Sequence, residues 1–124
     1  MSKLNFNSLL VSSENPEKLR DFYGKIFDKE PDMDDKDYFG WLVGSGFITF
    51  GPHDKVKGQS KNPERVILNF QTDDFKEEFE RIKDLGAEVI AEAYEAGEGM
   101  WIATFADPDG NYFQLISPWN SGKN

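Results

Sequence analysis

The stretch Met100–Trp119, MWIATFADPDGNYFQLISPW, decides the fold of this 124-residue chain. It holds two β-prone runs on either side of the tetrapeptide DPDG at 107–110. In such a turn proline presets φ, aspartate side chains accept hydrogen bonds from nearby backbone amides, and glycine tolerates positive φ. The second run alternates with a period of two residues, as expected of a strand with two different faces. The stretch therefore predicts a β-hairpin.

The first half of the chain predicts a strand, a helix and three further strands. A strand at Leu4–Ser12 precedes a helix from Pro16 to about Phe27, for which Asn15 is the expected N-cap and proline the first helical residue. The acidic loop Asp28–Asp37 contains a short edge strand. The last two strands, which glycines 44 and 46 join as a hairpin, are Tyr38–Val43 and Phe47–Gly51.

The second half repeats this order after a polar segment at 52–64, which we interpret as a linker. It predicts a strand at Arg65–Gln71, a helix that Asp74 and Glu77 begin as a capping box, and a short strand at Glu88–Ala91 before the final hairpin. Two βαβββ modules joined in one domain bury more apolar surface than one. We therefore expect a single domain over 1–124, with modules at 1–51 and 65–124.

The strands have one apolar face and one mixed face. Alternate residues such as Ile48, Phe50, Phe113 and Leu115 are apolar and are expected to pack on the helices. The opposite parity mixes polar and aromatic residues, namely Ser8, Leu10, Ser12, Phe47, Thr49, Asn69, Gln71, Tyr112, Gln114 and Ile116. Such a face suits a ligand cleft. It also suits a half-solvated sheet surface or a dimer interface.

Composition limits the classes of function. The formal net charge is −9, which disfavours nucleic acid as a partner and favours a cationic one. Excess carboxylates also serve solubility alone. The chain has no cysteine, which excludes disulfides and thiolate chemistry, and it contains neither a secretory signal nor an apolar run of membrane-spanning length. We expect a cytoplasmic protein with no membrane partner.

Three segments in order resemble the vicinal oxygen chelate superfamily, also called the glyoxalase/bleomycin-resistance family. NPEKLRDFYGKIF at 15–27 resembles the helix that follows the family's first strand, and FADPDGNYFQLISP at 105–118 resembles its final hairpin. QTDDFKEEFERIKDLGAE at 71–88 is similar to the second strand and helix pair. The resemblance implies an α+β fold in which the two βαβββ modules form a cupped, incompletely closed eight-stranded sheet.

Many members of this family chelate a divalent metal through four positions, two in each module. The resemblance carries those positions to Ser8, Thr49, Ile67 and Gln114. Transition-metal sites use imidazole, carboxylate or thiolate ligands, and isoleucine offers no donor at all. The only histidine, His53, lies in the linker. We therefore expect no metal ligands and no cofactor.

The sequence analysis favours a small-molecule-binding protein that sequesters its ligand, as bleomycin-resistance proteins do. Its expected ligand is cationic or aromatic, and the resemblance implies a homodimer. The candidate binding residues are Ser8, Phe39, Trp41, Phe47, Thr49, Asn69, Trp101, Tyr112 and Gln114. Aromatic faces beside carboxylates attract planar cations. The alternatives are a metal-dependent lyase, isomerase or dioxygenase-like enzyme with displaced ligands, and a protein that uses the mixed face only to dimerise.

Overall fold

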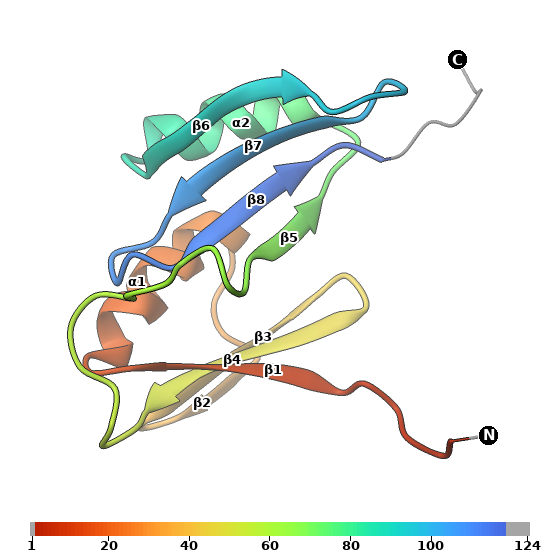
Figure 1. Cartoon of the computed structure of the whole chain (residues 1–124). Helices are drawn as coiled ribbons and strands as arrows, with labels where there is room; N and C mark the ends of the chain where they lie inside the picture. Colours follow the sequence, from red (N-terminus) through yellow and green to blue (C-terminus); the bar gives the residue numbers. More distant parts are fainter. Residues whose placement is uncertain (1, 119–124) are drawn as a thin grey trace. The chain divides into compact units, whose positions relative to one another are not determined.

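The computed structural model describes residues 2–118 and contains two βαβββ units (Figure 1). They divide between Gly58 and Gln59, inside the expected linker. The elements of the first unit are β1 (Ser8–Ser13), α1 (Pro16–Phe27), β2 (Met33–Asp35), β3 (Tyr38–Val43) and β4 (Gly46–Pro52). Those of the second unit are β5 (Leu68–Gln71), α2 (Phe75–Asp84), β6 (Glu88–Glu95), β7 (Trp101–Ala106) and β8 (Tyr112–Ile116).

Each unit has its own four-stranded sheet. The strand orders are β1-β4-β3-β2 and β5-β8-β7-β6, and in each sheet only the first pair of neighbours is parallel. The matching orders confirm the expected internal repeat and the α+β class. The single helix of each unit packs on its own sheet, α1 on β1, β3 and β4, and α2 on β6 and β8.

The first strand of each unit begins later than the sequence predicted. β1 starts at Ser8 rather than at residue 4, because its partner β4 begins only at Gly46 and Ser8 already pairs with Phe47. β5 starts at Leu68 rather than at residue 65, because Leu68 pairs with Phe113 near the start of β8. Strand length follows the hydrogen-bonding partner here and not the local β-propensity.

The helices begin where the sequence predicted, but not through the predicted side-chain caps. Neither Asn15 nor Asp74 makes a side-chain cap hydrogen bond, so the proposed capping box of Asp74 is wrong. Instead the hydroxyl of Ser13 accepts a bond from the backbone N–H of Asn15, and Thr72 does the same for Asp74, each at 3.0 Å. These hydroxyls, two residues earlier, turn the chain from strand to helix.

Aromatic side chains fill the core of each unit. In the first, Tyr23 of α1 stacks on Phe50 with their ring centroids 4.6 Å apart. In the second, Phe105 lies between Phe79 of α2 and Phe113, at centroid distances of 5.6 and 5.4 Å. Within residues 2–118 no helix has both the length and the apolar character needed to cross a membrane.

Candidate functional site

The second sheet carries a row of neutral polar side chains on the face opposite α2. Asn69 pairs with Gln114 across β5 and β8, and Gln114 pairs with Thr104 across β8 and β7. The amide Nε2 of Gln114 donates a hydrogen bond to Thr104 Oγ1 at 3.1 Å. Thr104 is buried, Gln114 half-buried and Asn69 exposed. The row therefore grades from a buried hydroxyl to a solvated amide.

The DPDG turn sets the register of this row. Asp107 Oδ1 accepts hydrogen bonds from the backbone N–H groups of Asp109 and Asn111 at 2.9 and 3.0 Å, and Asn111 Nδ2 donates to Asp107 Oδ2 at 3.0 Å. Gly110 takes φ of +81°, which suits glycine. The closed turn pairs Ala106 with Tyr112, which in turn places Gln114 opposite Thr104.

Tyr112 and Ile116 flank Gln114 on the same face, since side chains two residues apart in a strand point the same way. Both are partly exposed, while the intervening Phe113 and Leu115 are buried toward α2. Tyr112, Asn69 and Gln114 are therefore brought to one face as the sequence predicted. Thr104 was not singled out, because only the pairing of β7 with β8 reveals that it adjoins Gln114.

The first sheet presents Ser8, Phe47 and Thr49 on the face opposite α1. Ser8 pairs with Phe47, and Thr49 pairs with Gly40 of β3. The ring of Phe47 leans over Gly40, where an added Cβ would lie 2.6 Å from Phe47 Cε2. The glycine is thus the place where this aromatic ring lies flat against the sheet.

Phe39 and Trp41 lie on the other face of the first sheet, against α1. Their exposed fractions are 1% and 0%, and pairing of Trp41 with Ile48 places both on the helix side. The indole packs against Phe27 and Phe50 at centroid distances of 5.5 and 5.8 Å. Both side chains belong to the core and are not brought to the face that carries Ser8 and Thr49.

Trp101 is also separated from Gln114, because it lies on the α2 side of the second sheet. There it borders a groove of about 370 Å³ together with Phe75 and Phe79 of α2. Its side chain is 42% exposed. Trp101 therefore belongs to a surface groove beside the helix rather than to the polar row.

The four positions that the resemblance carries to this chain do not fit a divalent metal. Ser8, Thr49 and Gln114 offer neutral oxygen donors, and Ile67, which precedes β5, offers none. Metal sites of this kind need imidazole, carboxylate or thiolate ligands. Among residues 2–118, no three or more histidine, aspartate or glutamate side chains gather into a group that could hold a metal ion. His53 lies in an exposed loop, where its Nδ1 accepts a bond from Lys55 N–H at 3.1 Å.

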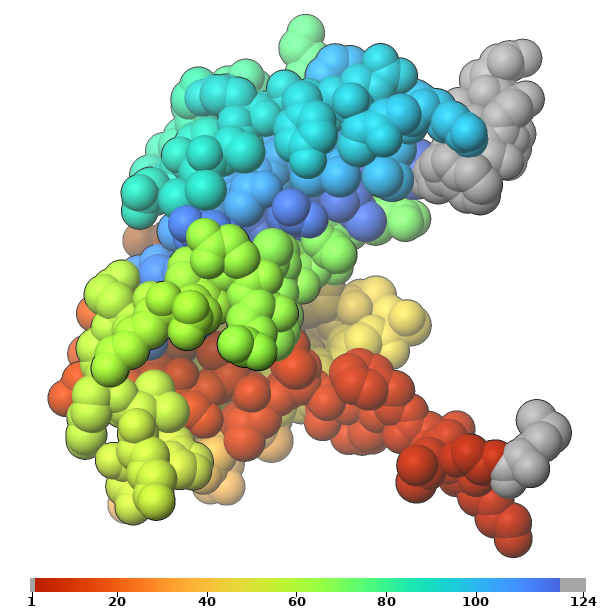
Figure 2. Space-filling view, viewed as in Figure 1, coloured from red at the N-terminus to blue at the C-terminus, as the bar shows by residue number. Residues whose placement is uncertain are grey.

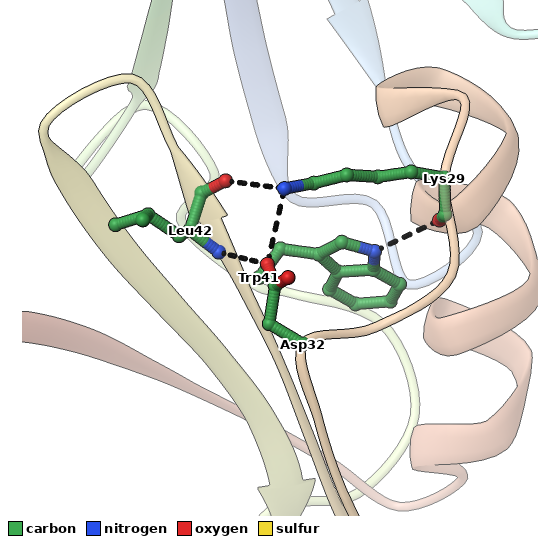
Figure 3. Close-up of polar contacts among 4 residues, drawn as sticks. All are labelled: Lys29, Asp32, Trp41 and Leu42. Carbon is green, nitrogen blue, oxygen red and sulfur yellow. Dashed lines mark hydrogen bonds and ion pairs between the residues drawn. The ribbon is translucent and has the colours of Figure 1, made fainter.

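The acidic loop after α1 serves the edge of the first sheet instead of binding a cation (Figure 3). Asp32 Oδ2 accepts a bond from the backbone N–H of Leu42 at 2.7 Å, and Lys29 Nζ donates to the carbonyl of Leu42 at 2.8 Å. Lys29 Nζ also lies 3.0 Å from Asp32 Oδ2. Trp41 Nε1 donates to the carbonyl of Lys29 at 3.0 Å. The loop is thereby fastened to β3 beyond the end of β2.

The Leu42 N–H bond and then the Lys29 ammonium lower the pKa of Asp32 below its ordinary value of 3.8. Because the folded-state pKa is the lower one, this contribution to stability is present above pH 3.8 and is lost as the pH falls through the folded pKa. We expect Asp32→Asn to narrow its stability difference from the unmodified chain as acid is added. Urea unfolding midpoints followed from neutral pH to about pH 2 test this.

The matched control for this prediction is Asp34→Asn, which removes an exposed carboxylate from β2. Its midpoints are expected to follow those of the unmodified chain at every pH. A stability difference for Asp32→Asn that stays constant down to the lowest pH would contradict the role given to the carboxylate.

Comparisons with known proteins agree with the fold and the hairpin. Residues 8–116 match the glyoxalase-like domain family. A glyoxalase/bleomycin resistance protein from Catenulispora acidiphila DSM 44928 has a TM-score of 0.71 at 14% identity, over 92% of this chain and 99% of that one. A glyoxalase-related enzyme from Fulvimarina pelagi has a TM-score of 0.74 at 17% identity, over 93% and 89%.

A third similar structure is the fosfomycin resistance protein FosX from Listeria monocytogenes, with a TM-score of 0.68 at 21% identity, over 93% of this chain and 91% of that one. At these identities the structures show a shared fold only. No curated protein matches the chain significantly. The family match spans nearly all of both units, so this chain belongs to the glyoxalase-like domain family.

Proposed function

We propose that this protein binds a small molecule without a metal, and that Gln114 is its principal hydrogen-bonding group. The observation that carries the proposal is the half-buried Gln114 amide, bonded to the buried Thr104 hydroxyl at the position where a metal-binding relative needs a charged ligand. A neutral amide orients a ligand by hydrogen bonds but contributes no charge to hold a dication. An uncharged recognition row is therefore the favoured reading.

The expected ligand is planar or cationic. Tyr112 and Ile116 offer aromatic and apolar surface beside the polar row, and the net charge of −9 favours a positive ligand. Ser8, Phe47 and Thr49 form the equivalent group on the first sheet and are the second set of candidate contacts. The cytoplasmic location expected from the absence of cysteine is part of the same proposal.

The alternative is a metal-dependent enzyme, because relatives with this fold include a glyoxalase-related enzyme and a fosfomycin resistance protein. That alternative would require ligands other than those at the four family positions. The neutral donors found there favour binding over metal-assisted catalysis, and they make Gln114 the residue on which the two readings differ.

The experiment measures binding of two probes, metal-free bleomycin and the planar cation proflavine, by calorimetry. For whichever probe binds the unmodified protein, Gln114→Ala is expected to weaken affinity about tenfold, the usual cost of losing a part-buried hydrogen bond. The matched control is Gln71→Ala, which removes an exposed amide from β5 one row away and is expected to leave affinity within about twofold.

A metal series decides against the proposal if it succeeds. A rise in the thermal midpoint with Mg²⁺, Mn²⁺, Co²⁺, Ni²⁺ or Zn²⁺ that EDTA reverses would identify a folded-state metal site and favour the enzyme. Equal affinity of Gln114→Ala and the unmodified chain for a bound probe would remove Gln114 from the site.

A further inference from the structure

The N-terminal segment Ser2–Asn7, here called the arm, leaves two large apolar side chains almost fully exposed. Leu4 is 90% and Phe6 89% exposed. The arm extends away from β1 in the space-filling view (Figure 2). Leu10 of β1 and Leu42 of β3 add apolar surface on the first sheet, at 56% and 51% exposure. Single exposed apolar residues are ordinary, but a group of them marks an interaction surface.

The first sheet cannot cover the arm. β4 begins at Gly46, and the pairing of β1 with β4 starts at Ser8 with Phe47. The chain before Ser8 therefore has no strand beside it in this sheet. Leu4, Phe6 and Leu10 share one parity, so in an extended chain they lie on the same side as the face that carries Thr49. The apolar surface continues from the arm onto that face.

The charge of this region limits what can cover it. Lys3 is the only charged residue from Ser2 to Ser13. The face of the first sheet opposite α1 is formed along β1, β3 and β4 by uncharged residues, namely Ser8, Leu10, Ser12, Tyr38, Gly40, Leu42, Phe47, Thr49 and Gly51. A basic partner would find no carboxylate on these three strands. A second copy of this chain, with its own net charge of −9, would meet no like charge there.

The amount of apolar surface also suits a second copy. Each large aromatic side chain buries about 150–250 Å², and a standard interface buries about 800 Å² on each partner. Leu4, Phe6, Leu10 and Leu42 from one chain supply a substantial share of that area. In a two-fold dimer the same patch is used on both subunits, so each arm finds an apolar face on the other copy.

We propose that the arm docks on a second copy of this chain and that Leu4 and Phe6 anchor a homodimer. The arm lies outside residues 8–116, which match the glyoxalase-like domain family, so the family match does not account for it. Dimerisation through the first sheet is independent of the Gln114 row on the second sheet.

The experiment is sedimentation velocity of the full chain at concentrations up to about 100 µM. The unmodified chain is expected to dimerise, and the double variant Leu4→Ser, Phe6→Ser to associate at least about 100-fold more weakly, because both anchors lose apolar burial. The matched control is Val66→Ser with Leu85→Ser, which removes two exposed apolar residues from the second unit and is expected to leave the dimer intact.

Salt separates a second copy from a charged partner surface. Two chains of charge −9 repel each other at long range, so raising the salt from about 50 to about 300 mM is expected to strengthen the dimer. An unmodified chain that stays monomeric, a double variant that dimerises normally, or a dimer that salt dissociates would each overturn the proposal. Probe binding, read separately with Gln114→Ala, reports only on the proposed function.

Discussion

Trp41→Ala is expected to lower the free energy of unfolding by about 3–5 kcal/mol, the range for truncating a large aromatic residue in a core. The indole is fully buried between Phe27 and Phe50. Alanine would leave a cavity beneath α1 and would also remove the bond from Nε1 to the carbonyl of Lys29. Urea unfolding followed by far-UV circular dichroism measures the loss without relying on tryptophan fluorescence.

Trp101→Ala is the matched control for this prediction. Trp101 is 42% exposed at the groove beside α2, so its removal should cost about 1 kcal/mol. The sequence treated the two tryptophans alike as binding candidates, whereas the structure assigns one to the core and the other to the surface. Equal losses of stability in the two variants would contradict that distinction.

Asp107→Ala is expected to cost about 2–4 kcal/mol, because the buried carboxylate accepts bonds from several donors at once. Its Oδ1 serves the backbone N–H groups of Asp109 and Asn111, and the Asn111 side chain adds a further bond. Alanine leaves these donors without their acceptor in a turn where Asp107 is 5% exposed. The same unfolding measurement detects the loss.

Two controls define the role of Asp107. Asp107→Asn keeps one oxygen acceptor and is expected to lose less stability than the alanine variant, whereas Asp54→Ala removes a carboxylate that is 88% exposed and is expected to change stability by no more than about 0.5 kcal/mol. An alanine variant of Asp107 as stable as the unmodified chain would show that the turn closes without its side chain.

The elements with local determinants were predicted well. The helix Pro16–Phe27 and the DPDG turn depend on residues within a few positions of one another, so their sequence suffices. The starts of β1 and β5 were predicted too early, because each depends on where a distant strand begins. The predicted helix caps failed for a related reason, since Ser13 and Thr72 compete for the same turns.

The candidate site was predicted only in part. Gln114, Asn69 and Tyr112 follow from the alternation of β5 and β8 and share a face. The β3 sequence YFGWLV is apolar at both parities, so the side on which Trp41 lies is fixed only by its pairing with Ile48. For Thr104, position along the chain gives no hint of its bond to Gln114, which arises from the pairing of two strands.

The fastening of Leu42 by Lys29 and Asp32 has a consequence for how this protein behaves when crowded. Beyond the end of β2, the N–H and carbonyl of Leu42 would otherwise be an open template for strand addition by a neighbouring molecule. An ammonium and a carboxylate occupy both groups, and a β-strand that approached would have to displace two charges. The α1–β2 loop therefore acts as a guard against fibril-like growth at this edge.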